Sequence, residues 1–416
     1  METMKVLVRE VDMEKDLPAV EELERRCQVG LSGDMAAVHD HAVDDDVDGD
    51  GKNTSKKKTK TKKKKTGMSL CVEQIGDPLA RVRHAPDHVM LVAEYGDDEE
   101  KKNIVGVIKA CVKTVSRGGK QHKPFVKVAY LLGLRVSPSH RRLGIGTALV
   151  RRAEEWCSAR GAEHATMATT ASNAASLALF TGRNFGYAPF RHPEFIGRPV
   201  HAGHRLPIPS RHRVFHLPPE LAAAAYSRIL PPHAAEFLPS DLPSLLSHKL
   251  TLGTFVAVLG ESFAILSVWD STRSMSMRVD GAPAMLRAAL AAARAIDRGA
   301  PWLRVPSIRD IFRPFGAYLM YGLRMYGPDG PALLRSLCHH AHNVARRNPA
   351  CAVVAADLSP DDPAAAAVPR WRRFSCDEDV WCIKRLNAGA GDGGDGDDWE
   401  AEAAAGSVLF VDPREF

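Results

Sequence analysis

The stretch Tyr130–Thr147, which reads Tyr-Leu-Leu-Gly-Leu-Arg-Val-Ser-Pro-Ser-His-Arg-Arg-Leu-Gly-Ile-Gly-Thr, decides the fold. An apolar strand pattern ends near Pro138, and an amphipathic helical pattern with Leu149, Ala153 and Cys157 on one face starts after the glycines. The chain therefore passes from a strand through a glycine-rich bend into a helix. Backbone N–H groups at such a helix start lack intrahelical partners and favour anions. The pattern predicts a phosphate-binding turn.

Two common phosphate-binding motifs do not fit this bend. No Gly-Lys-Ser/Thr closes it, which excludes a Walker A loop. Only Gly144 and Gly146 are present, so no G-x-G-x-x-G dinucleotide fingerprint can be written.

The bend resembles the pyrophosphate loop of the GNAT superfamily of N-acetyltransferases, whose signature is Arg/Gln-x-x-Gly-x-Gly/Ala. The matching residues are Arg141, Gly144 and Gly146, and the family's Val-x-Pro precedes them at Val136 and Pro138. The resemblance continues through the following helix, strand and Asn-bearing helix. It implies direct acetyl transfer from acetyl-CoA, as a substrate, to an amine, with no metal.

The pattern of the first 200 residues follows the β-α-β-β-β-α-β-α order of that family. We expect strands and helices over Met4–Val11, Glu14–Arg26, Val89–Tyr95, Ile104–Val115, Phe125–Val136, Thr147–Arg160 and Ala165–Thr169. The resemblance implies an α/β (α+β) fold with a mixed, mostly antiparallel sheet and helices on both faces. We predict a GNAT acetyltransferase domain over residues 1–200.

An internal echo indicates a second unit. Tyr321–Met325 reads Tyr-Gly-Leu-Arg-Met and repeats the Leu-Gly-Leu-Arg-Val of Leu132–Val136. A helical pattern over 332–346 and an apolar strand over 351–355 follow, but the Arg-x-x-Gly-x-Gly chemistry is missing. We predict a degenerate GNAT-like domain over 251–386, with chance similarity between two α/β stretches as the alternative.

The remaining segments are predicted from composition. Residues 201–250 are rich in Pro, His and Arg and are expected to form a linker. Residues 387–416 form a Gly/Asp-rich tail whose apolar end is expected to dock back onto the protein. Residues 34–67 are an Asp/Lys-rich insertion that is expected to be disordered. Its lysine tract, Lys56–Lys65, is consistent with a nuclear import signal, and a solvated loop is the alternative.

The resemblance also implies how acetyl-CoA is held. The strand edge at Leu134–Val136 would bond the pantetheine arm, and the amides from Arg142 to Thr147 would bond the pyrophosphate, with Arg141 adding charge. Asn173 and Phe180 lie in the helix motif that follows. The predicted cofactor-binding residues are Leu134, Arg135, Val136, Arg141, Arg142, Leu143, Gly144, Ile145, Gly146, Thr147, Asn173 and Phe180.

The catalytic acid and base stay unassigned at this point. The family often has a tyrosine as general acid where this chain has Phe180, which has no proton to give. Histone-type members have a glutamate base at the position of Tyr130, and a tyrosine pKa of about 10 suits a base poorly at neutral pH. Glu94 is a weak candidate for a base that acts through water, with a solvated strand-end carboxylate as the alternative.

Composition narrows the protein class. The net charge of +6 is spread thinly, because residues 34–67 hold nine Lys and seven Asp, so direct nucleic-acid binding is not favoured. No apolar run approaches the roughly 20 residues of a membrane span. The eight cysteines are scattered without a C-x-x-C pair, which favours reduced thiols in a nuclear or cytosolic protein.

Nearly the whole chain is similar to the Hookless-type probable N-acetyltransferases of plants. The shared features are the Gly-Leu-Arg-Val-x-Pro-x-x-Arg-Arg-x-Gly-Ile-Gly block, the Phe180–Tyr187 continuation, the long C-terminal half and the ending Phe-Val-Asp-Pro-Arg-Glu-Phe. This resemblance implies a nuclear regulator of seedling growth and hormone response. The amine acceptor is unknown, with a protein or histone lysine among the candidates. The alternative function is a catalytically weak or inactive acetyl-CoA-binding regulatory protein.

Overall fold

The computed structural model describes residues 6–27, 29–30, 69–96, 103–119, 123–303, 305–371, 379–386, 399 and 407–415. The predicted insertion 34–67, with its lysine tract, lies outside the described residues.

The first sheet carries the glycine-rich bend. Its strands run in the order β1-β4-β5-β6-β7-β17-β8, and β11 pairs with β5 and with β18. All pairings are antiparallel except β6 with β7 and β11 with β18. The bounds are Val6–Glu10 (β1), Asp87–Tyr95 (β4), Asn103–Arg117 (β5), Phe125–Val136 (β6), His164–Thr170 (β7), Ala188–Arg191 (β8), Ala235–Pro239 (β11), Asp379–Arg385 (β17) and Val408–Leu409 (β18).

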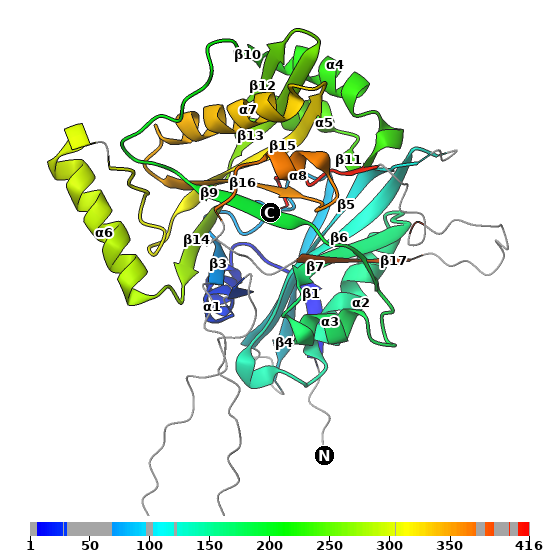
Figure 1. Ribbon diagram of the computed structural model, residues 1–416. Coiled ribbons are helices and arrows are strands. Elements are labelled where there is room, and N and C mark those ends of the chain that lie inside the picture. Colours follow the sequence, from blue (N-terminus) through cyan, green and yellow to red (C-terminus); the bar gives the residue numbers. More distant parts are fainter. Residues whose placement is uncertain are drawn as a thin grey trace, which may run out of the picture.

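Helices lie on both faces of this sheet (Figure 1). Helix α2, Ile145–Ser158, packs on one face through buried Leu149, Ala153 and Cys157, the residues that the helical pattern places together. Helix α1, Leu17–Arg26, packs on the opposite face through Val20 and Leu23. Helix α3, Ala174–Phe180, follows β7.

The second sheet has the strand order β10-β12-β13-β15-β16-β9. Helix α7, Gly330–Ala345, packs on one face, and helices α4, Pro219–Ile229, and α5, Leu242–Ser247, pack on the other. One pair in this sheet is parallel, β15 with β16, as β6 with β7 is in the first sheet. The strand bounds are Glu194–Pro199 (β9), Arg213–Leu217 (β10), Thr251–Leu259 (β12), Ser262–Asp270 (β13), Gly316–Tyr326 (β15) and Cys351–Leu358 (β16).

The two sheets exchange strands across the predicted boundaries. β9 follows β8 directly along the chain but pairs with β16 in the second sheet. β17 lies within the predicted 251–386 domain but pairs with β7 and β8 in the first sheet. The boundaries at residues 200 and 251 therefore do not separate the sheets. Strand patterns report which segments are extended but not which sheet each one joins.

The predicted linker 201–250 is also corrected. It contains β10, α4, β11 and α5, and β10 with α4 opens the second unit as β1 with α1 opens the first. The proline-rich composition misled the prediction because Pro218, Pro219 and Pro243 lie at helix starts, where a missing N–H costs nothing.

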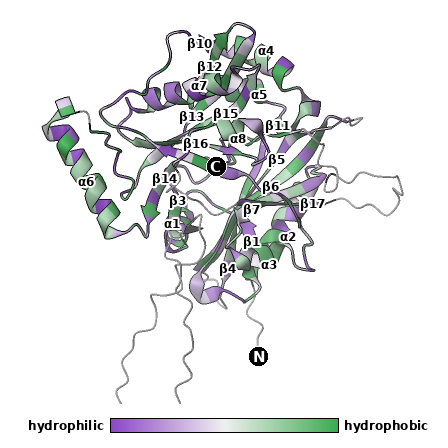
Figure 2. Cartoon of the chain, viewed as in Figure 1, coloured by the Kyte–Doolittle hydropathy of each residue, from purple (hydrophilic) through white to green (hydrophobic). Residues whose placement is uncertain are grey.

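Two peripheral features complete the structure. A three-stranded sheet joins β14, Met275–Asp280, with β3, Ser69–Gln74, and β2, Val29–Gly30. Helix α6, Ala284–Gly299, stands away from both sheets and carries hydrophobic and hydrophilic residues (Figures 1 and 2). Among the described residues, no helix has the length and apolar content that crossing a membrane requires.

The chain end ties the two units together. Leu409 packs in the core of the first unit, whereas Phe410 packs in the core of the second. Asp412 accepts a hydrogen bond from Lys113 Nζ at 2.5 Å, and Arg414 donates to Asp241 at 2.7 Å. Burial alone would raise the pKa of Asp412, but Lys113 and Arg414 more than offset it and hold the pKa below its ordinary value.

Candidate active site

The parallel pair β6 and β7 separates halfway along its length. The strands pair only where Val128–Leu131 faces His164–Met167. Beyond Leu131, the edge of β6 that faced β7 has no strand partner among the described residues. At this point β6 also has a β-bulge. Leu132 pairs with Lys109 and Arg135 pairs with Val107, so β6 advances three residues while β5 advances two. The result is an open strand edge from Leu132 to Val136.

A glycine makes the bulge possible. Gly133 has φ of +61°, a left-handed conformation that other residues adopt only with strain. Past the bulge, Leu134 and Val136 pack toward α2, while Arg135 is half-buried and lies opposite Val107. Desolvation lowers the pKa of Arg135. The strand edge predicted for the pantetheine arm is thus present and open.

The bend between β6 and α2 is exposed and has free backbone donors. In the described part of the chain, no hydrogen bond uses the backbone N–H of any residue from Arg141 to Thr147. The first helical bond runs from the Ala148 N–H to the Gly144 carbonyl at 3.0 Å. Residues 141–144 are exposed. These amides lie at the positive end of a 14-residue helix, which favours an anion.

The two glycines of this bend have different roles. The backbone conformation accounts for Gly144, whereas Gly146 has free space beside it. Arg142 has φ of +65° and Gly144 has φ of +79°, so the bend turns its amides outward through two left-handed residues. Gly146 is helical, and a Cβ there would meet only ordinary contacts, the nearest being Leu179 Cδ2 at 3.5 Å. Packing within the described chain therefore does not require glycine at position 146. A ligand that approaches the backbone closely at this position would require it.

Two predicted cofactor residues have structural roles in this structure. Asn173 caps α3, because its side chain accepts a hydrogen bond from the Ser176 N–H at 3.2 Å. Phe180 is 2% exposed and packs between Phe185 and Tyr187, with ring centroids 6.3 and 5.2 Å away. Their contact with a cofactor stays a prediction.

The two catalytic candidates from sequence lie in different surroundings. Tyr130 is buried against Phe237, with Lys113 Nζ 5.1 Å from its ring centroid, and burial raises its pKa well above the ordinary value. Glu94 accepts hydrogen bonds from Arg9 at 2.5 and 2.8 Å. It lies on β4, which β5 separates from β6, so the structure does not bring Glu94 to the open edge.

Sequence reasoning missed a charged group beside the bulge. Lys109 on β5 donates hydrogen bonds to Glu24 on α1 at 2.7 Å and to Gln74 on β3 at 2.8 Å. A Cβ on Gly133 would lie 3.7 Å from Lys109 Cδ, so the lysine crosses the bulge. One signal was available, namely a lysine within the apolar run Ile104–Val112.

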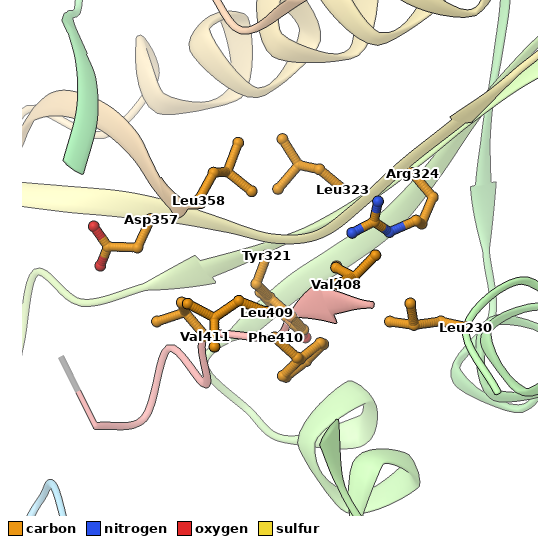
Figure 3. A pocket seen from close by; sticks show the side chains of 11 residues that line it. Leu230, Tyr321, Leu323, Arg324, Asp357, Leu358, Val408, Leu409, Phe410 and Val411 are labelled. Atoms are coloured by element: carbon orange, nitrogen blue, oxygen red, sulfur yellow. The ribbon is translucent and has the colours of Figure 1, made fainter. Parts of the chain in front are cut away.

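The second unit has the same bulge without the bend chemistry. Gly322 has φ of +63°, and β15 there opposes β13 with the same three-against-two step. Figure 3 shows a pocket beside it, lined by Leu230, Tyr321, Gly322, Leu323, Arg324, Asp357, Leu358, Val408, Leu409, Phe410 and Val411. The chain's own C-terminal segment therefore lies at the place where β15 leaves β16.

One group of side chains has the spacing of metal ligands. Ligand atoms of His84, Asp412 and Glu415 lie within 4.8 Å of one another. However, Lys113 Nζ already bonds both carboxylates. Because an ammonium ion there supplies the positive charge, the group fits a buried ion-pair network better than a cation site.

Comparisons with known proteins agree with this geometry. Residues 65–187 match the Acetyltransferase (GNAT) family, a range that includes β6, the bend, α2 and α3. The chain is 82% identical over 418 residues to "Acetyl transferase GW6a" of Oryza sativa subsp. japonica, covering 99% of this chain and 98% of that protein. It is 40% identical over 443 residues to "Probable N-acetyltransferase HLS1" of Arabidopsis thaliana, covering 99% and 100%.

A solved structure extends the likeness of fold to both halves. A Saccharomyces cerevisiae N-myristoyltransferase aligns with a TM-score of 0.51 at 11% identity, covering 92% of this chain and 80% of that one. The predicted α/β fold, with its mixed and mostly antiparallel sheets, is confirmed. The predicted resemblance to plant N-acetyltransferases is confirmed by the two plant relatives. The chain therefore belongs to the GNAT family of N-acetyltransferases.

Proposed function

We propose that the first unit binds acetyl-CoA, with its diphosphate on the bend 141–147 and its pantetheine arm along the open edge of β6. The observation that carries this proposal is the run of unpaired backbone amides from Arg141 to Thr147, of which residues 141–144 are exposed. Arg141 and Arg142 add positive charge beside them. Laid along Leu132–Val136, the arm brings its thioester to the point where β6 and β7 part.

The reaction we propose is attack of an amine nitrogen on the thioester carbonyl, with coenzyme A as leaving group. A backbone N–H on the edge of β6 beyond Leu131, which has no strand partner in the described part of the chain, is suited to donate a hydrogen bond to the developing oxyanion. The proposed acceptor class is a lysine amine on a protein, and a histone mixture is the first acceptor to assay. Proximity on this preformed edge supplies a large part of the rate.

Calorimetry tests the binding step. We expect saturable binding of acetyl-CoA, and of free CoA and desulfo-CoA, because all three carry the same diphosphate. Gly146→Val should abolish binding, because its side chain extends into the space beside the amides. The matched control is Gly299→Ala in α6, where a Cβ meets no atom within 4 Å and binding should be unchanged. Equal binding by the Gly146→Val variant would reject the proposed diphosphate site.

A second candidate function is acetyl-CoA binding without turnover. It is favoured by Phe180, which cannot donate a proton, and by Tyr130, whose burial raises its pKa far above neutral pH. Acetyl-CoA binding with no acetylated product from histones, free lysine or small amines would select this candidate.

We also propose a nuclear location on the basis of the lysine tract 56–65. Fluorescent fusions of the full chain and of a variant with the tract's lysines changed to serine test it. The first should accumulate in nuclei and the second should not.

A further inference from the structure

Lys109 passes over the point where the cofactor edge opens. It lies opposite Leu132 at the bulge of β6. Its side chain crosses Gly133, as the 3.7 Å approach of Lys109 Cδ to a Cβ built on Gly133 shows. The thioester of the bound acetyl-CoA proposed above lies at this same place. A lysine amine is therefore held within the unit that would bind the acetyl donor.

The amine has a carboxylate in place to take a proton. Lys109 is 1% exposed, and its Nζ lies 2.7 Å from Glu24 Oε1. The Glu24 side chain is 22% exposed, so it connects the buried amine with solvent. Burial lowers the pKa of Lys109, although Glu24 opposes this shift. A nucleophile within hydrogen-bond reach of a base is the arrangement that acyl transfer needs.

The second unit shows that the fold does not need a charged pair here. Tyr226 is the eighth residue of α4, as Glu24 is of α1, and Ser267 faces Tyr321 as Lys109 faces Leu132. Tyr226 Oη and Ser267 Oγ are 3.0 Å apart. A Cβ on Gly322 would lie 2.6 Å from Tyr226 Oη, so neutral side chains close this place. The unit with the intact bend has the Glu–Lys pair instead.

A second lysine on the same strand provides the contrast. Lys113 projects from the same face of β5 and is also buried against carboxylates, Asp412 and Glu415. Burial alone would lower the pKa of Lys113, but these two carboxylates raise it above the ordinary value. Lys113 lies opposite Val128, where β6 is still paired with β7. It shares the chemistry of Lys109 but not the position.

We propose that Lys109 is acetylated by acetyl-CoA bound in the same unit, with Glu24 as the proton acceptor. This inference rests on the proposed cofactor site. Lys109 Nζ loses a proton to Glu24, and Glu24 passes this proton to solvent. The neutral nitrogen then attacks the thioester carbonyl carbon. The C–S bond breaks, and the coenzyme A thiolate takes the second proton from nitrogen. The products are an N-acetyl-lysine amide and free coenzyme A, and Glu24 loses its ion-pair partner.

Mass spectrometry of the full chain tests the inference. The purified protein is incubated with carbon-13-labelled acetyl-CoA, and peptides are mapped for the labelled acetyl group. We expect label on Lys109 at least tenfold above that on Lys113, with exposed Lys127 reporting acetylation by free reagent. Acetyl-CoA binding by calorimetry together with no label on Lys109 would overturn the inference and leave the proposed function standing. No binding in the same sample would overturn both.

Variants separate the residues of this step. Glu24→Gln should slow labelling of Lys109 by about 10²-fold, the usual scale of a lost general base, without weakening acetyl-CoA binding. Lys113→Arg should leave the labelling rate of Lys109 unchanged. Circular dichroism of each variant checks folding. An unchanged labelling rate in folded Glu24→Gln would refute the role of Glu24.

Discussion

Gly133 and Gly322 occupy the same bulge in the two sheets, with φ of +61° and +63°, and they lie under different side chains. Lys109 crosses the first, and the Tyr226 hydroxyl closes over the second. Both backbones turn in the same way, yet only one bulge lies beside a bend with free amides. The two units therefore share the backbone of the bulge but differ in the side chain that covers it and in the bend beside it.

Alanine at these two glycines should give unequal losses of stability. Each change forces a left-handed alanine, at a cost of about 1–2 kcal/mol. Gly322→Ala also places a Cβ 2.6 Å from Tyr226 Oη, and such overpacking costs about 1–3 kcal/mol more. Urea unfolding should therefore show a lower free energy of unfolding for Gly322→Ala than for Gly133→Ala. The double variant Gly322→Ala with Tyr226→Phe should recover part of the difference, and no recovery would contradict the clash.

The C-terminal ion pairs should matter far more than an exposed one. Arg414→Ala removes one of the two cationic partners of buried Asp412, which keeps Lys113, and also the partner of half-exposed Asp241, so it should cost about 1.5–3 kcal/mol of unfolding free energy. The control is Arg83→Ala, whose ion pair with Asp77 is solvent-exposed and should contribute at most about 1 kcal/mol. Thermal unfolding of both variants checks this, and losses of equal size would contradict it.

Acid should weaken the same network. The folded-state pKa of Asp412 is depressed, so its contribution to stability is present above the unfolded pKa of about 3.9 and is lost as pH falls below it. We expect the stability gap between the native protein and Asp412→Asn to shrink between pH 6 and pH 3. A gap that is constant over this range would argue against an ionised Asp412.

Asp357 should behave in the opposite way. Burial raises its pKa well above the ordinary value, and its Oδ1 has no hydrogen-bond partner among the described residues. A raised carboxyl pKa destabilises the fold increasingly as pH rises above the unfolded pKa. Asp357→Asn should therefore increase the free energy of unfolding by about 1–3 kcal/mol at pH 8 and by less at pH 4. Thermal melts at the two pH values test the sign, and a destabilised variant at pH 8 would contradict it.

The charges of Arg141 and Arg142 at the bend should strengthen acetyl-CoA binding only moderately. Arg141→Gln and Arg142→Gln should each weaken acetyl-CoA binding about 3- to 10-fold, and added salt should shrink this difference because both side chains are exposed. Arg25→Gln, an exposed arginine on α1, is the matched control and should not change binding. Calorimetry at two salt concentrations measures all three.

Much of the fold near the bend could be predicted because its signals are local. Phe125–Val136 is a strand with the predicted bounds, and α2 begins two residues before the predicted Thr147. The partners of β9 and β17 could not be predicted, because an alternating pattern fits either sheet. The prolines of 201–250 indicate turns as readily as helix starts, so the sequence predicts a linker where α4 and α5 lie.

The candidate site shows the same division. The bend lies within one short motif, and its exposed amides follow from two glycines and a helix start. The Glu24–Lys109 pair joins residues 85 positions apart, from a helix and a strand that no shared motif connects. Only the packing of α1 across the bulge of β6 brings them together.

Because β9 and β17 each pair in the sheet of the other half, neither half of the chain can form its complete sheet alone. A product that stopped near residue 200 would keep the whole bend yet lack the strand that separates β7 from β8, and its β9 would have no sheet to enter. Nonsense or frameshift alleles late in the coding sequence should thus behave as complete losses. The protein should therefore behave genetically as one unit, although it contains two sheets of similar construction.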